Sequence, residues 1–111
     1  MLKSQKWGRC MNSKLKTPAV EQLFEAVLSL ENKDECFDFF EDVCTINELL
    51  SLAQRFEVAK MLREHKTYLD IAEKTGASTA TISRVNRCLN YGEKGYKAVL
   101  SNLPDDAGKK N

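Results

Sequence analysis

Only two prolines occur in this chain of 111 residues, Pro18 and Pro104, and they lie near its two ends. Proline interrupts an α-helix more strongly than any other residue, because it lacks the backbone N–H and clashes with the preceding turn. The proline-free interval between them shows apolar residues at helical spacing and no alternating Val, Ile and Thr pattern. We therefore predict an all-α chain of about six helices joined by short turns.

Capping residues mark where these helices begin. Thr17 stands directly before Pro18, which opens a helix of about 15 residues, and a shorter acidic and aromatic helix follows after residues 32–34. Thr45 and Glu48 have the spacing of a capping box, so they open a long helix that ends near residues 63–66. A last helix is expected at about residues 93–102.

Charge is distributed unevenly along the chain. The 17 basic and 16 acidic side chains leave a net charge of +1. Residues 1–20 contain five basic residues and no acid, whereas residues 21–49 contain nine acids and one lysine. A polyanion would be attracted to residues 74–97 and to the basic arm at the start of the chain. The basic residues of that segment are Lys74, Arg84, Arg87, Lys94 and Lys97. We expect a flexible basic arm at 1–16, a single helical domain at 17–103 and a flexible tail at 104–111.

Several function classes lack the residues that they require. His65 is the only histidine and the four cysteines form no C-x-x-C pair, so we expect neither a metal site nor a catalytic centre. The acids of residues 34–42 are typical of the solvated face of an amphipathic helix. No apolar run approaches the ~18–20 residues of a membrane span, and no signal peptide is recognisable. We therefore expect a cytoplasmic protein without catalytic activity, cofactor or membrane association.

Residues 67–89 carry the pattern that most specifically indicates a function. Thr67 and Ser78 are suited to cap two short helices, and Gly76 suits a turn that needs positive φ. Ala72 supplies the small residue where two steeply crossed helices touch. These features predict a helix-turn-helix, whose second helix is held down by an apolar face made of Ile71, Ala77, Ile82 and Val85.

The opposite face of that second helix begins with small polar side chains. Small residues allow the backbone to approach base edges in the major groove, and arginines follow on or near the same face. Helix N-termini and hydroxyl groups also suit phosphate oxygens. We predict binding to double-stranded DNA through Thr67, Tyr68, Ser78, Thr79, Ala80, Thr81, Ser83, Arg84 and Arg87. We interpret Trp7 and Tyr91 as candidate exposed aromatic residues that pack against protein rather than stack on bases.

Residues from about 40 to 95 resemble the Trp repressor superfamily, in particular its Trp-repressor-like members of unassigned ligand, the YerC/YecD type. The segments that carry the resemblance are TINELLSLAQR at 45–55, TYLDIA at 67–72 and GASTATISRVNR at 76–87. The resemblance implies an intertwined homodimer in which the N-terminal helices of both chains form one shared core. Its two helix-turn-helix units would face successive major grooves of a palindromic operator, about 34 Å apart.

The resemblance also raises tryptophan as a co-ligand. In the repressor the indole lies between two arginines, which Arg55 and Arg84 match, and Thr45 matches a threonine of the pocket. Val85, however, replaces a glycine that leaves room for the indole, and Cys88 replaces a serine that helps hold the amino group. Overpacking costs about 1–3 kcal/mol and a lost hydrogen bond about 1 kcal/mol. We therefore predict a vestigial pocket and no physiological binding of free tryptophan.

The sequence thus predicts a homodimeric bacterial transcriptional regulator, expected to act as a repressor, that binds DNA through residues 67–89. The alternative is a protein-interaction module that docks another regulator through the same helices. Salt dependence distinguishes the two, because neutralising phosphates makes DNA affinity fall steeply with ionic strength.

Overall fold

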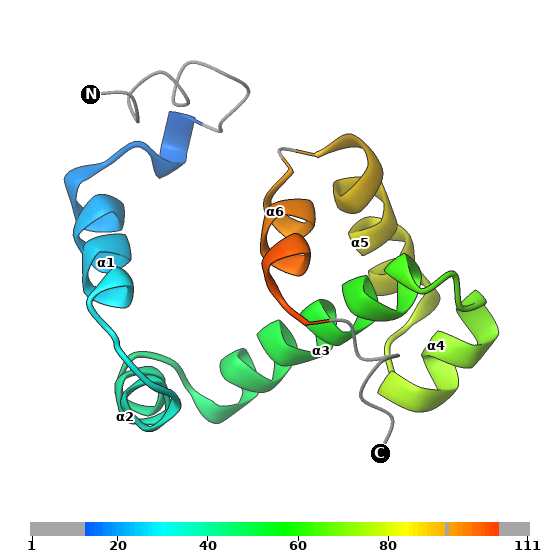
Figure 1. Ribbon diagram of the computed structural model, residues 1–111, viewed down its shortest axis with the longest axis horizontal. Coiled ribbons are helices and arrows are strands. Elements are labelled where there is room, and N and C mark those ends of the chain that lie inside the picture. Colours follow the sequence, from blue (N-terminus) through cyan, green and yellow to red (C-terminus); the bar gives the residue numbers. More distant parts are fainter. Residues whose placement is uncertain (1–12, 93, 105–111) are drawn as a thin grey trace. The chain divides into compact units, whose positions relative to one another are not determined.

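The computed structural model describes residues 13–92 and 94–104. Over these residues the chain contains a short 3₁₀ turn, six α-helices and no strand, which confirms the predicted all-α class (Figure 1). The predicted arm 1–16 and tail 104–111 lie largely outside the described residues. The elements are η2 (Ser13–Leu15), α1 (Pro18–Leu28), α2 (Lys33–Val43), α3 (Ile46–Arg63), α4 (Tyr68–Thr75), α5 (Thr79–Tyr91) and α6 (Gly95–Asn102).

The chain divides into two compact units, residues 1–49 and residues 50–111. Helices α1 and α2 belong to the first unit and α4 to α6 belong to the second, while α3 begins in the first and continues in the second. The prediction of a single domain over 17–103 stays a prediction.

Helix α1 begins as predicted and ends earlier than predicted. The Thr17 hydroxyl accepts a hydrogen bond from the Val20 N–H at 3.2 Å, and Pro18 is the first helical residue. The helix ends at Leu28, where the Ser29 hydroxyl donates to the Ala26 carbonyl at 2.7 Å. The early end follows because residues 29–32 lead into the next helix, which starts at Lys33 with Asn32 as its cap.

No side chain of α1 or α2 is buried in the chain. The large apolar residues of these two helices are instead exposed over a substantial part of their surface, and Leu28 is exposed by 82%. Such a concentration of exposed apolar side chains is unusual for a surface that faces only water. The exposed residues are Leu23, Phe24, Leu28, Phe37 and Val43.

Helix α3 starts with the predicted capping box. The Glu48 N–H donates to the Thr45 hydroxyl at 3.0 Å, and the Thr45 N–H donates to the Glu48 carboxylate at 2.9 Å. The helix ends where His65 adopts a left-handed conformation (φ 64°) and the Lys66 N–H reaches back to the Met61 carbonyl at 3.1 Å. This is the Schellman arrangement, formed here by histidine instead of the more common glycine.

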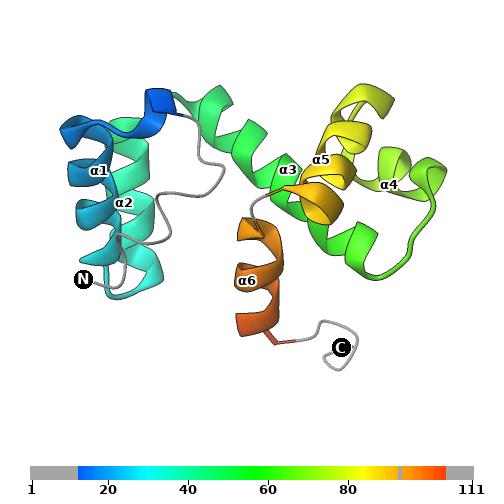
Figure 2. The same cartoon turned by 90° about the horizontal axis from the view of Figure 1, so that it is seen from above.

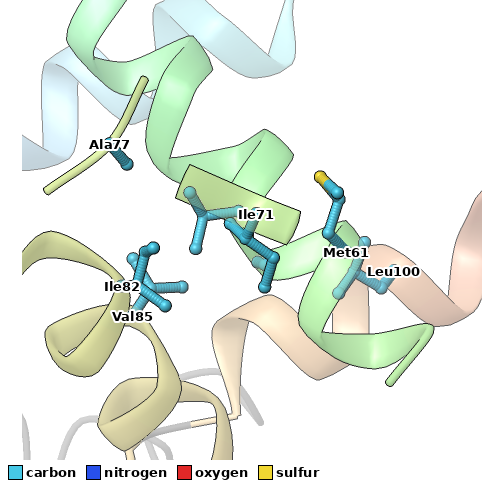
Figure 3. Close-up of a cluster of buried hydrophobic side chains, with 8 residues drawn as sticks. Met61, Ile71, Ala77, Ile82, Val85 and Leu100 are labelled. Atoms are coloured by element: carbon cyan, nitrogen blue, oxygen red, sulfur yellow. The ribbon is translucent and has the colours of Figure 1, made fainter. Parts of the chain in front are cut away.

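The core of the second unit is formed by side chains from α3, α4, α5 and α6 and from the turn between α4 and α5. Ile82 and Val85 of α5 lie against Ile71 of α4, while Met61 of α3 lies beside Leu100 of α6 (Figure 3). Helix α5 contacts both α4 and α6 (Figure 2). The predicted apolar face is therefore confirmed. The complete buried set is Val58, Ala59, Met61, Ile71, Ala77, Ile82, Val85 and Leu100.

Helix α6 begins at Gly95, later than predicted, because Lys94 before it has a left-handed backbone (φ 76°). The Arg63 Nη1 donates to the Leu100 carbonyl at 2.6 Å, which fixes the end of α6 on α3. Among the described residues, no helix has the length and apolarity needed to cross a membrane.

Candidate nucleic-acid interface

Thr67 forms the start of α4. Its backbone is extended (φ −76°, ψ 159°), and its hydroxyl accepts a hydrogen bond from the Asp70 N–H at 3.1 Å. The predicted N-cap is confirmed. Thr67 is exposed, and Tyr68 beside it is exposed by 38%. Both side chains therefore lie at the surface, next to the partially positive N-terminus of α4.

The turn between α4 and α5 depends on Gly76, which ends α4 with φ 75°. Its N–H donates to the Ala72 carbonyl at 2.9 Å, so the helix closes on a left-handed residue that glycine adopts without steric cost. Ala77 follows and is buried in the core, whereas Ser78 is exposed. The predicted helix, turn and helix are thus present in the predicted places.

The start of α5 is built by Ser78. Its hydroxyl accepts a hydrogen bond from the Thr81 N–H at 3.1 Å and donates to the Thr81 hydroxyl at 3.2 Å. Thr79 and Ala80 are exposed in the first turn, and Thr81 and Ser83 are half-buried. The first turn of α5 therefore presents short side chains and accessible backbone at the surface.

The two faces of α5 differ in character. Ile82 and Val85 are buried, whereas Ala80, Arg84 and Arg87 are exposed. The exposed three follow each other at intervals of four and three residues, so they lie along one stripe of the helix, away from the buried side. The small side chain of Ala80 at the beginning of this stripe is therefore followed by two long cationic ones.

The charge of this stripe is not neutralised locally. Helix α5 contains no acidic residue, and within the described part of the chain neither Arg84 nor Arg87 forms a salt bridge. On α4, Lys74 lies 4.0 Å from Asp70, an exposed pair of the kind that contributes little to stability. Both guanidinium groups of α5 are accordingly available to an anionic or acceptor-rich partner.

The residues matched to a tryptophan pocket differ in burial and in local role. In the first unit the Thr45 hydroxyl caps α3. In the second unit Arg55 and Cys88 are half-buried and Arg84 is exposed, while Val85 is only 1% exposed and belongs to the core. The Val85 side chain therefore already packs against protein on its buried side.

Tyr91, the last residue of α5, is exposed by 85% in the single chain, and its packing role stays a prediction. Trp7 lies outside the described residues. Gln54 of α3 donates from Nε2 to the Thr75 carbonyl at 3.0 Å, a contact across 21 residues that no local pattern signals.

A family model described as Trp repressor protein matches residues 18–104. The chain belongs to the Trp repressor family. Within that family it is 56% identical over 92 residues to the uncharacterized protein YerC of Bacillus subtilis, which covers 83% of this chain and 88% of YerC. It is 34% identical over 101 residues to the Trp operon repressor homolog of Chlamydia caviae, covering 87% of this chain and 84% of that protein.

The fold agrees with that of a solved TrpR-like protein. The crystal structure of a TrpR-like protein from Eubacterium eligens superimposes with a TM-score of 0.79 at 76% sequence identity, over 84% of this chain and 99% of that one. The superfamily and the YerC type predicted from the sequence are confirmed. Trp repressor-like proteins form a family of regulators rather than of enzymes. Among the described residues, no group of three or more His, Cys, Asp or Glu side chains is placed to hold a metal ion.

Proposed function

We propose that this protein is a sequence-specific DNA-binding transcriptional regulator that acts as a homodimer and represses its targets. The observation that carries the proposal is the exposed side of α5, where the small residues Thr79 and Ala80 of the first turn precede the exposed arginines Arg84 and Arg87. Short side chains let a helix enter the major groove closely, and arginine is the side chain that most often reads guanine there.

In this proposal, phosphate contacts position the protein and base contacts select the sequence. The exposed residues Thr67 and Ser78 begin two helices whose free N–H groups suit phosphate oxygens. Thr79, Ala80 and Ser83 would contact base edges directly. Arg84, one turn beyond Ala80 on α5, would make a bidentate contact with a base. Tyr68 and Thr81 lie next to the two caps and would add phosphate contacts.

The homodimer is supported by the first unit. The apolar side chains of α1 and α2 are exposed, and a second copy of the chain would cover them with its own apolar side chains, as expected of a self-complementary two-fold interface. Sedimentation equilibrium should give twice the chain mass of 12.6 kDa. Replacing Phe37 by glutamate should shift the protein toward monomer, because it places a charge among apolar groups. A 12.6 kDa species that binds DNA as tightly as the native protein would contradict the dimer.

The proposal that the protein represses rather than activates its targets is supported by its relatives. One of them is named a Trp operon repressor homolog, and a dimer seated in two major grooves would exclude other proteins from the same DNA. We therefore propose repression by occupancy of an operator.

Selection of bound duplexes from a random DNA pool tests the proposal. We expect enrichment of a motif with two-fold symmetry, whose half-sites lie about 10 base pairs apart. Affinity for the selected duplex should fall steeply between about 50 and 200 mM salt. DNA recognition would be refuted if no sequence is enriched and the affinity for DNA does not change with salt concentration. That result would favour a protein-docking role for the same helices.

We also propose that DNA binding needs no tryptophan and no other cofactor. The support is Val85, which is buried in the core at the position where the repressor of the family has a glycine. An indole in that slot would have to displace packed side chains, at a cost of about 1–3 kcal/mol. Calorimetric titration with tryptophan should show no binding in the micromolar range, and the affinity for the selected duplex should not change when tryptophan is added. Micromolar binding would show that the pocket is intact.

A further inference from the structure

One polar side chain connects the turn between α4 and α5 to helix α3. Gln54 is half-buried, and its Nε2 donates a hydrogen bond of 3.0 Å to the carbonyl of Thr75, the last residue of α4. The final carbonyls of a helix have no partner within the helix, so an external donor is needed if they are to be satisfied inside the protein. Gln54 supplies that donor from another helix.

The Thr75 side chain extends this connection through the turn. Its hydroxyl donates to the Ile71 carbonyl at 2.8 Å and accepts from the Ala77 N–H at 3.1 Å. Gly76 lies between these groups, and a Cβ built there would be 4.0 Å from the Gln54 Nε2. The turn is therefore held to α4 by Thr75 and to α3 by Gln54.

Apolar packing also holds α4 and α5 on α3. Val58 and Ala59 of α3 are fully buried, together with Ile71 and Ile82. Apolar burial drives such packing but is not directional. A hydrogen bond has a preferred length and angle, so it restricts how the turn can slide over α3. Ser78 and the first turn of α5 follow this turn directly.

We propose that Gln54 is a positioning residue for DNA recognition, because its hydrogen bond to Thr75 fixes where the first turn of α5 lies on α3. The inference rests on the proposed function, since it assumes that this turn reads DNA. Base-specific contacts need side chains held to within about 0.5 Å, whereas contacts to phosphates tolerate more displacement. Loss of the bond should therefore weaken specific binding more than nonspecific binding.

Three substitutions of Gln54 distinguish the effect of its hydrogen-bond donor from the effect of its size and shape. Gln54→Met keeps the length of the side chain and removes the donor, and Gln54→Glu keeps its shape and also lacks a donor. Gln54→Lys keeps a donor of similar reach. The quantity to measure is the ratio of affinities for the duplex selected by the wild-type protein and a scrambled duplex of equal length. We expect a ratio about fivefold lower for Met and Glu, and a ratio near wild type for Lys.

Ser51→Ala provides the control, since Ser51 is an exposed position one turn earlier on the same helix. It should leave the ratio unchanged. Thermal melting identifies variants that are folded, and if Gln54→Met does not fold, Gln54→Glu and Gln54→Lys still provide the comparison. A folded donor-free variant with the wild-type ratio would overturn the inference.

Amide hydrogen exchange tests the same inference without DNA. The Ala77 amide, bonded to the Thr75 hydroxyl, should exchange at least about fivefold faster in Gln54→Met than in the wild type, because the turn opens more often. Unchanged exchange would overturn the positioning role. If the wild-type protein prefers no duplex, the proposed function fails, and the exchange result alone then decides whether Gln54 holds the turn.

Discussion

Ser78 is the residue at which the stability of α5 and its proposed contact with DNA can be separated. Its hydroxyl accepts a hydrogen bond from the Thr81 N–H at 3.1 Å and caps the helix. Ser78→Ala removes this acceptor, which costs about 1 kcal/mol of folding stability. For a domain of this size, that cost lowers the melting temperature by about 4–8 °C. Ser78→Asp keeps a capping acceptor and adds a favourable charge at the helix N-terminus, so its melting temperature should equal or exceed that of the wild type.

The order of the wild type and the Ser78 variants in DNA affinity should differ from their order in folding stability. A carboxylate at position 78 would face a phosphate, and two like charges 4 Å apart repel by about 1 kcal/mol in water and about 4 kcal/mol near a protein surface. Ser78→Asp should therefore bind the selected duplex about tenfold more weakly, or worse, although it is fully folded. Fluorescence anisotropy with a labelled duplex measures the affinity, and circular dichroism measures the melting temperature.

Asn32→Asp is the matched control for this experiment. Asn32 caps α2 by accepting from the Glu35 N–H at 2.9 Å, so the substitution makes the same change of net charge at another helix cap. It should leave DNA affinity unchanged. The reasoning is refuted if Ser78→Asp is folded and binds the selected duplex as tightly as the wild type and Asn32→Asp do.

Two further predictions concern α5 and its end. Arg84→Ala should cost about 1–3 kcal/mol of binding and relax the preference at one base position, as measured by repeating the selection; uniform weakening across sequences would make Arg84 a phosphate contact instead. Gly92→Ala should destabilise the fold by about 1–3 kcal/mol in denaturant unfolding, because the new Cβ would lie 2.5 Å from the Cys88 carbonyl oxygen. Gly95→Ala should be neutral or stabilising by up to about 1 kcal/mol, since nothing lies within 4 Å of that position, and equal effects at both glycines would contradict the steric argument.

The helix starts were predictable because capping is a local property. Thr17, Thr45, Thr67 and Ser78 each bond to a backbone N–H three residues ahead, so the sequence contains both partners within one turn. The buried face of α5 was predictable for a related reason, since helical periodicity alone places Ile82 and Val85 on one side. The same periodicity identified the exposed stripe, although which of its residues contact DNA stays a prediction.

The features that the sequence did not reveal depend on less common or distant interactions. His65 and Lys94 adopt left-handed backbones that local propensity assigns to glycine or asparagine. The bond from Gln54 to Thr75 joins residues far apart in the chain, and only the packed helices bring them together.

The central claim is that the exposed stripe at the start of α5 contacts DNA. NMR titration of the dimer with the selected duplex tests it most directly, by following the backbone amide resonances along the whole chain. The largest changes are expected at residues 78–87 and around Thr67, with small changes across α1 and α2. The claim would be contradicted if saturating duplex left the amides of residues 78–87 unshifted, or if the largest shifts lay on α1 and α2.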